Sequence, residues 1–269
     1  MLYLLAAVAL FLVGVVGFNL LTFAIAFARP PRPPRLLPAL LFEIVAALAL
    51  LPFWPLFALL GRHYRLTLEH RRSNGRPLIL LHGYGMNRTN WLWLGRLLAR
   101  RGIGPAYGVS YFSPFRLERS SARLARFVEE VATAERAIKV DIVAHSLGGL
   151  VARDYIERLG GAGRVRHLVT IATPHRGTFW GRHAVGPVRQ VLRQRDPTWV
   201  VTPPDGVTYT SIWSRCDNLI VPSDSARLGD GGSPGLDGPA DVIFDDLGHL
   251  GLLVSPRVAD AVAVRLQRD

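Results

Sequence analysis

The chain has 269 residues, of which 49% are hydrophobic, and a formal net charge of +12. A single cysteine, Cys216, excludes an intramolecular disulfide and any metal site built from several cysteines. The positive charges are scattered along the chain, singly or in pairs, with no basic run interleaved with aromatic residues. We therefore expect a basic face near anionic lipid headgroups and no nucleic-acid partner.

The excess of apolar residues lies at the N-terminus. Residues 2–28 hold no charged side chain, and this length is enough for a helix to cross a hydrocarbon core of roughly 30 Å. Residues 36–61 form a second apolar stretch, interrupted by Glu43 and by prolines, and the arginine- and proline-rich linker 29–35 joins the two. The sequence predicts a membrane anchor at residues 1–61 with two transmembrane helices, at about 2–28 and 36–61.

Two other interpretations of this region compete. A cleaved signal peptide normally begins with a basic segment, which is missing here, and the apolar run is about twice the usual length. Glu43 is costly in lipid and prolines kink a helix, so the second stretch is also compatible with a helix in the interface or buried against the first.

The membrane orientation depends on the arginines that flank the anchor. The linker 29–35 carries three arginines and favours the cytoplasmic side, which leaves the following domain outside. Arg62, Arg65, Arg71, Arg72 and Arg76 favour the opposite orientation. We expect an integral protein of a bacterial inner membrane, with its large domain on the outer (periplasmic) face.

Residues 62–76 are predicted to be a juxtamembrane linker with an opening strand at 64–69, and residues 77–269 one α/β domain. The predicted strands are 77–81, 103–109, 140–145, 165–172, 207–213 and 241–244, and the predicted helices are 89–100, 118–137, 147–159, 188–195 and 256–266. Alternating strands and helices imply a mostly parallel sheet with helices on both faces. Reactive residues of such sheets gather at the carboxyl ends of the strands.

The stretch from Val140 to Leu150 changes from a strand pattern to a helix pattern at Ser146. A strand that turns directly into a helix needs small residues two before and two after the joint, and these are Ala144 and Gly148. Such a nucleophile elbow pushes the hydroxyl out of the sheet in front of unpaired helix N–H groups. Five-residue patterns of this kind also occur by chance, as plain strand-to-helix turns.

A serine nucleophile needs a base, a carboxylate that orients the base and donors for the oxyanion. The other predicted strand ends supply His82-Gly83-Tyr84, Asp217 and His249, in the chain order serine, acid, histidine. Asp245 and Asp246 are alternative acids. The spacing of the histidines is not that of a metal site.

With these residues the sequence resembles the α/β-hydrolase superfamily and, within it, small bacterial triacylglycerol lipases and carboxylesterases. Five separated matches carry the resemblance: His82-Gly83, Ala144 to Gly149, Thr173 to Thr178, Asp217 with Ile220-Val221-Pro222, and Gly248 to Leu253. The commonest family form has glycine where this chain has Ala144.

The resemblance implies Ser146 as nucleophile, His249 as general base and Asp217 as its orienting acid. It implies an oxyanion hole made by the backbone N–H groups of Tyr84 and Leu147. His82, Gly83, Ala144, Gly148 and His175 would support the elbow and the site, and neither a metal nor another cofactor is implied.

The sequence thus favours a membrane-anchored serine hydrolase of acyl or lipid esters. An acyltransferase or thioesterase with the same triad, and a catalytically silent binding module, remain alternatives. Residues 178–208 would form a cap or an acyl groove, or pack as an ordinary loop, and residues 87–94, with Trp91 and Trp93, would form an apolar rim. Acyl-chain length and oligomeric state are not defined by these patterns.

Overall fold

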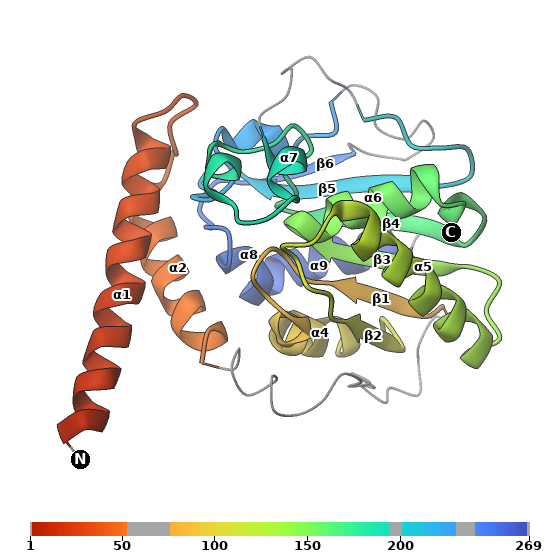
Figure 1. The fold of residues 1–269 in the computed structure, drawn as a ribbon, viewed down its shortest axis with the longest axis horizontal. Coiled ribbons are helices and arrows are strands. Elements are labelled where there is room, and N and C mark those ends of the chain that lie inside the picture. Colours follow the sequence, from red (N-terminus) through yellow and green to blue (C-terminus); the bar gives the residue numbers. More distant parts are fainter. Residues whose placement is uncertain (1, 53–75, 194–200, 230–239, 268–269) are drawn as a thin grey trace.

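The computed structural model describes residues 2–52, 76–193, 201–229 and 240–267. A six-stranded, all-parallel sheet organises the chain, with strand order β2-β1-β3-β4-β5-β6 (Figure 1). The strands are β1 (Leu78–Leu81), β2 (Ala106–Val109), β3 (Val140–His145), β4 (Val165–Ile171), β5 (Thr208–Ser214) and β6 (Asp241–Phe244). The predicted α/β fold with a mostly parallel sheet is confirmed.

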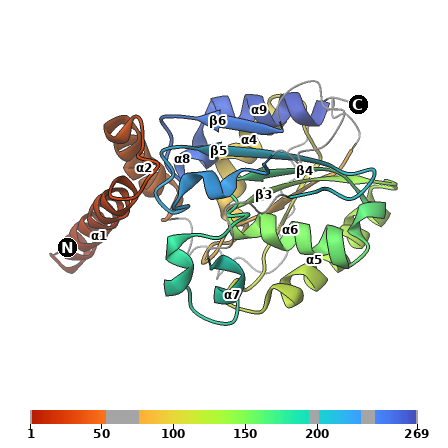
Figure 2. The same cartoon turned by 90° about the horizontal axis from the view of Figure 1, so that it is seen from above.

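Helices cover both faces of the sheet, because parallel strands need crossover connections that return over one face or the other. One face carries α5 (Leu117–Ala134) and α6 (Leu147–Arg158), and the other carries α4 (Trp91–Ala99), α8 (Gly251–Val254) and α9 (Pro256–Gln267) (Figure 2). Two buried apolar clusters fill the two interfaces, one beneath α5 and α6 and one beneath α4, α8 and α9. The carboxyl ends of the strands are therefore held in place by packed side chains on both faces of the sheet.

The chain reverses its direction of winding between β1 and β3. From β1 it runs outward to β2 and then returns to β3 on the other side of β1. At such a switch point the loops after two neighbouring strands part and leave a crevice at the carboxyl edge, where α/β proteins bind their ligands. Here those loops are the segments that begin at His82 and at Ser146.

The predicted strands and helices from residue 77 onward are present, most of them with shifted ends. The expected helix at 89–100 is a 3-10 turn, Arg88–Asn90, followed by α4, and the expected helix at 188–195 begins one residue later as α7 (Arg189–Leu192). The short helix α8 was not predicted. The strand expected at 64–69 lies outside the described residues.

The N-terminal region forms a helical hairpin beside the carboxyl edge of the sheet (Figure 1). Helix α1 (Leu2–Phe27) is long and apolar enough to cross a membrane over Leu5–Phe27. Helix α2 (Leu36–Leu50) has 15 residues, about 22 Å at the usual rise, which is less than a span needs. Residues 53–61 of the second predicted span lie outside the described residues.

Candidate active site

Ser146 stands at the tight corner between β3 and α6. Its backbone angles, φ 53° and ψ −125°, are in a region that residues other than glycine rarely adopt. The Ser146 N–H donates to the Ile171 carbonyl of β4 at 2.8 Å, which fixes the corner to the sheet. The strained geometry is that of a nucleophile elbow, and the hydroxyl faces a pocket at the carboxyl edge.

The elbow is possible because neighbouring positions have no side chain. A methyl group on Gly148 would lie 2.7 Å from the His82 carbonyl oxygen and 2.8 Å from that of Leu81. A methyl group on Gly83 would lie 2.9 Å from Ser146 Cβ. Ala144, two residues before the serine, is completely buried in β3. The loop after β1 and the start of α6 are therefore in van der Waals contact around Ser146.

The expected oxyanion donors lie on either side of this contact. Leu147 is the first residue of α6, so its N–H has no acceptor within the helix. Tyr84 follows Gly83 and lines the pocket that Ser146 faces. Its hydroxyl accepts a hydrogen bond from the Val185 N–H at 2.9 Å, which ties the loop after β1 to residues 184–186. The backbone of both residues is thus held next to the serine.

His249 and Asp217 form a buried pair. His249 Nδ1 lies 2.9 Å from Asp217 Oδ2 and 3.1 Å from Oδ1. Asp217 Oδ1 also accepts the N–H groups of Leu219 and Ile220, each at 2.8 Å. These backbone donors fix the carboxylate, and the carboxylate fixes the ring with Nδ1 toward it and Nε2 free to face the pocket.

The alternative acids make other pairs. Asp245 binds Arg215 at 3.0 Å and Asp246 binds Arg257 at 2.9 Å, all four at least partly exposed to solvent. Among the described residues, no hydrogen bond joins the Ser146 hydroxyl to His249. Such bonds often tighten only when substrate is bound.

His145, His82 and His175 are buried, and burial lowers the pKa of each. Burial, and then the charge of His249, hold the pKa of His145 well below its usual value, and its Nε2 lies 3.3 Å from the His249 carbonyl oxygen. Burial lowers the pKa of His82 to about 4, and the ring stacks on Tyr111. His175 contacts Arg153 and Thr170 and does not line the pocket. In the described chain, no cluster of three or more His, Cys, Asp or Glu side chains is arranged to hold a metal.

The pH dependence of His249 follows from its neighbours. Burial lowers its pKa, but the charge and hydrogen bond of Asp217, with a contribution from Glu43, outweigh burial and raise the pKa above 6.5. In its predicted role of general base, His249 must accept the serine proton at Nε2, and the protonated ring has no lone pair there. We expect kcat/KM for a p-nitrophenyl ester to rise with pH, with an inflection above 6.5. A pH-rate profile checks this, and an inflection below 6.5 would show that burial dominates.

Ser146 and His249 open into a largely apolar pocket of about 680 Å³, a volume typical of sites for drug-sized ligands. Six residues of the segment 178–208 line it: Thr178, Trp180, Gly181, His183, Ala184 and, from α7, Leu192. This segment therefore forms a pocket wall beside the serine. The expected rim at 87–94 does not: Trp91 is buried in the core beneath α4, and neither it nor Trp93 lines the pocket.

Glu43 and Asn218 bind the backbone of the His249 loop, and neither was assigned to the site from the sequence. Glu43 of α2 accepts the N–H groups of Leu250 at 2.8 Å and Gly251 at 2.7 Å. Asn218 accepts the His249 N–H at 3.1 Å and donates to Thr22 of α1 at 2.8 Å. The polar character of Glu43 within an apolar stretch was the one available signal.

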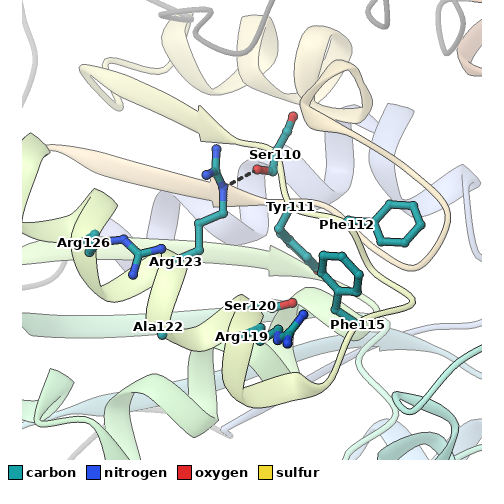
Figure 3. A pocket seen from close by; sticks show the side chains of 9 residues that line it. All are labelled: Ser110, Tyr111, Phe112, Phe115, Arg119, Ser120, Ala122, Arg123 and Arg126. Atoms are coloured by element: carbon teal, nitrogen blue, oxygen red, sulfur yellow. Dashed lines mark hydrogen bonds between the residues drawn. The ribbon is translucent and has the colours of Figure 1, made fainter.

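A second hollow, of about 800 Å³, lies between the loop after β2 and the start of α5 (Figure 3). Arg119, Arg123 and Arg126 line it. Arg119 lies beside the ring of Phe115, and Arg123 donates to the Ser110 carbonyl at 2.7 Å. It shares no residue with the pocket of Ser146. The residues that the sequence predicts to be catalytic therefore lie at the pocket of Ser146 and not at this hollow.

The parallel sheet, the elbow after β3 and the histidine after β6 define an α/β-hydrolase fold. Among the solved structures that share it is the lin2722 product of Listeria innocua, with a TM-score of 0.53 and 16% identity over 72% of this chain and 94% of that one. Aspergillus fumigatus lipase B has a TM-score of 0.56 and 16% identity over 79% of this chain and 57% of that one. Mature Bacillus licheniformis lipase BlEst2 has a TM-score of 0.53 and 14% identity over 73% of this chain and 93% of that one. At these identities the similarity concerns the fold.

The chain belongs to the palmitoyl protein thioesterase family, whose model matches residues 77–224, more than half of its length. The match includes Ser146 and Asp217 and ends before His249. The chain is therefore a member of a lipase- and esterase-like family of hydrolases.

Proposed function

We propose that the protein is a membrane-attached serine hydrolase that cleaves acyl esters with Ser146, His249 and Asp217. The observation that carries the proposal is the shared pocket: a strained serine and a histidine held by a buried carboxylate face the same apolar cavity. An apolar cavity suits the acyl part of a substrate, since burying it removes hydrocarbon from water.

In the proposed reaction, His249 Nε2 takes the proton of the Ser146 hydroxyl while Oγ attacks the ester carbonyl. The negative charge on the carbonyl oxygen is stabilised by the N–H groups of Leu147 and Tyr84. His249 then gives its proton to the leaving oxygen, and the acyl group stays on Ser146. Water, deprotonated by His249, then attacks the carbonyl of the acyl-enzyme. The bond to Ser146 Oγ breaks, His249 returns the proton to Oγ, and the acid is released.

A thioester substrate is the second candidate, and the family match favours it. The same steps apply to a thioester, with a thiol in place of the alcohol as leaving group. An acyltransferase differs only in the last step, where an alcohol or amine replaces water. Parallel assays with oxyesters and thioesters of the same acyl chain separate the first two, and added alcohol with product analysis identifies the third.

Membrane attachment is proposed from the outer face of the hairpin. Apolar side chains of α1 stay exposed along its whole length, among them Leu10, Val13 and Leu20, and Leu41 and Val45 continue the apolar surface on α2. An exposed apolar surface of this length is typical of contact with lipid. The outer (periplasmic) face remains the proposed side for the catalytic domain.

The experiment that tests the function is labelling with a fluorophosphonate probe, which reacts with activated serines. We expect the wild-type protein to be labelled, to sediment with membranes after carbonate extraction and to hydrolyse p-nitrophenyl esters. Ser146→Ala should abolish labelling and hydrolysis because no nucleophile remains. Ser120→Ala, at the second hollow, is the control and should retain both. Labelling that persists in Ser146→Ala would show that another residue is the nucleophile.

A further inference from the structure

The hairpin α1–α2 takes part in the pocket that contains Ser146. Eight lining residues of this pocket come from the hairpin: Phe11, Gly14, Val15, Phe18 and Asn19 of α1, and Glu43, Ala47 and Leu51 of α2 or its end. The rest come from the hydrolase domain, including Ser146 and His249. One wall of the pocket is therefore a helix whose other side is exposed and apolar.

The hairpin is attached to the domain through polar contacts at the His249 loop. Three consecutive N–H groups of this loop are bound: that of His249 by Asn218, which in turn contacts Thr22 of α1, and those of Leu250 and Gly251 by Glu43 of α2. Glu43, Thr22 and Asn218 are buried. An anchor that only tethered the domain would not need to bind the backbone on both sides of the catalytic histidine.

Two glycines of the His249 loop, Gly248 and Gly251, leave space for α2 to lie against the backbone of the loop. A methyl group on Gly248 would lie 2.5 Å from Glu43 Oε2, and one on Gly251 would lie 3.0 Å from the Phe42 ring. Both glycines flank His249, so α2 meets the loop at backbone distance. This also explains how an apolar helix accommodates a carboxylate: Glu43 faces the loop and not the lipid.

We propose that the hairpin is a working part of the active site, in which α1 is the wall that sets the length of the acyl chain and Glu43 is a positioning residue for His249. The proposal rests on the proposed hydrolase function. The substrate would be an amphiphilic acyl ester whose chain lies along α1 between Phe11 and Phe18, with its carbonyl at Ser146. Such a chain can pass into the pocket from the lipid that surrounds α1.

Two glycines of α1, Gly14 and Gly17, allow a matched test of the proposal that α1 sets the length of the acyl chain. A Cβ at Gly14 or at Gly17 meets no atom within 4 Å, so both accept a side chain without disturbing the helix, but only Gly14 lines the pocket. In the full-length protein in detergent, we expect Gly14→Phe to lower the ratio of kcat/KM for palmitate to that for butyrate p-nitrophenyl esters by about tenfold or more. Gly17→Phe should leave the ratio unchanged.

Glu43→Gln tests the positioning role. Glutamine keeps the size but presents an NH₂ group to one of the two loop N–H groups, so we expect kcat to fall about tenfold for both chain lengths. The groups that face His249 are Asp217 after β5, His145 at the end of β3 and Glu43 from α2. Removing the Glu43 carboxyl also removes its contribution to the raised pKa of His249, so the pH inflection should move downward, which a merely structural role would not do.

The outcomes separate this proposal from the proposed function. Wild-type protein without Ser146-dependent labelling would overturn the function itself. Labelling of wild type together with the same chain-length ratio in Gly14→Phe and Gly17→Phe would overturn the wall. An unchanged pH inflection in a labelled Glu43→Gln protein would overturn the positioning role.

Discussion

Asp217→Asn is expected to lower kcat by about 10⁴-fold while the protein stays folded. Oδ1 of Asp217 accepts the N–H groups of Leu219 and Ile220, so the amide oxygen of asparagine will take that position. Its NH₂ group then faces His249 Nδ1. A donor at this place stabilises the tautomer with the proton on Nε2, which cannot accept the Ser146 proton. The loss should therefore appear in kcat and not only in KM.

Asp245→Asn is the matched control for this substitution. Asp245 follows β6, close in sequence to His249, but pairs with the exposed Arg215. An exposed ion pair contributes little to stability, so kcat should stay within about twofold of wild type. Hydrolysis of a p-nitrophenyl ester under saturating substrate measures both variants. A large loss of kcat in Asp245→Asn, combined with an active Asp217→Asn, would show that the acid of the triad is Asp245 after β6 and not Asp217 after β5.

The strands and the elbow were predictable because their patterns are local. A run such as Leu78–Leu81 is apolar throughout because both faces of a parallel sheet are covered, and Asp241–Phe244 was predicted with its observed ends. The change of period at Ser146 identified the corner without further information. General rules for α/β folds place the carboxyl ends of parallel strands at one edge of the sheet, so the meeting of the loops after β1, β3, β5 and β6 could be anticipated without the strand order.

The role of the hairpin was not predictable in the same way. Glu43 and Leu250 are separated by 207 residues, and no periodic pattern connects them. In the sequence, Glu43 is a single acidic residue that interrupts an apolar span, and Gly248 is a glycine next to a histidine. The structure shows how the two are related: Gly248 leaves the space through which Glu43 reaches the backbone of the His249 loop. A buried charge within an apolar helix needs a partner, and the sequence does not name the partner.

Local patterns also misplaced aromatic residues. Trp91 was expected at an apolar rim, yet it is fully buried beneath α4 with Leu94 and Leu98. Spacing alone does not distinguish a tryptophan that faces the core from one that faces a ligand, because both lie on the apolar stripe of a helix. Trp180, in contrast, does line the pocket of Ser146.

Gly148→Ala is expected to destabilise the protein although it replaces glycine within a helix. In an unconstrained helix this change is favourable by about 0.5–1 kcal/mol. At Gly148 the added methyl would lie 2.7 Å from the His82 carbonyl oxygen and 2.8 Å from that of Leu81. Both obstacles are backbone, so α6 must move away from β1. We expect the free energy of unfolding to fall by about 1–3 kcal/mol, measured as a lower Tm in detergent.

The same movement should reduce activity more than stability. Ser146 and Leu147 belong to the start of α6, and the opposite wall of the site is the loop with Gly83 and Tyr84. A displacement of 1 Å between groups that must align typically costs about 10²-fold in rate. Gly163→Ala is the control, since a methyl there meets no atom within 4 Å, and it should retain Tm and kcat. Equal behaviour of the two variants would mean that the elbow tolerates a wider turn, and the contact between α6 and the loop after β1 would then not be what positions the serine.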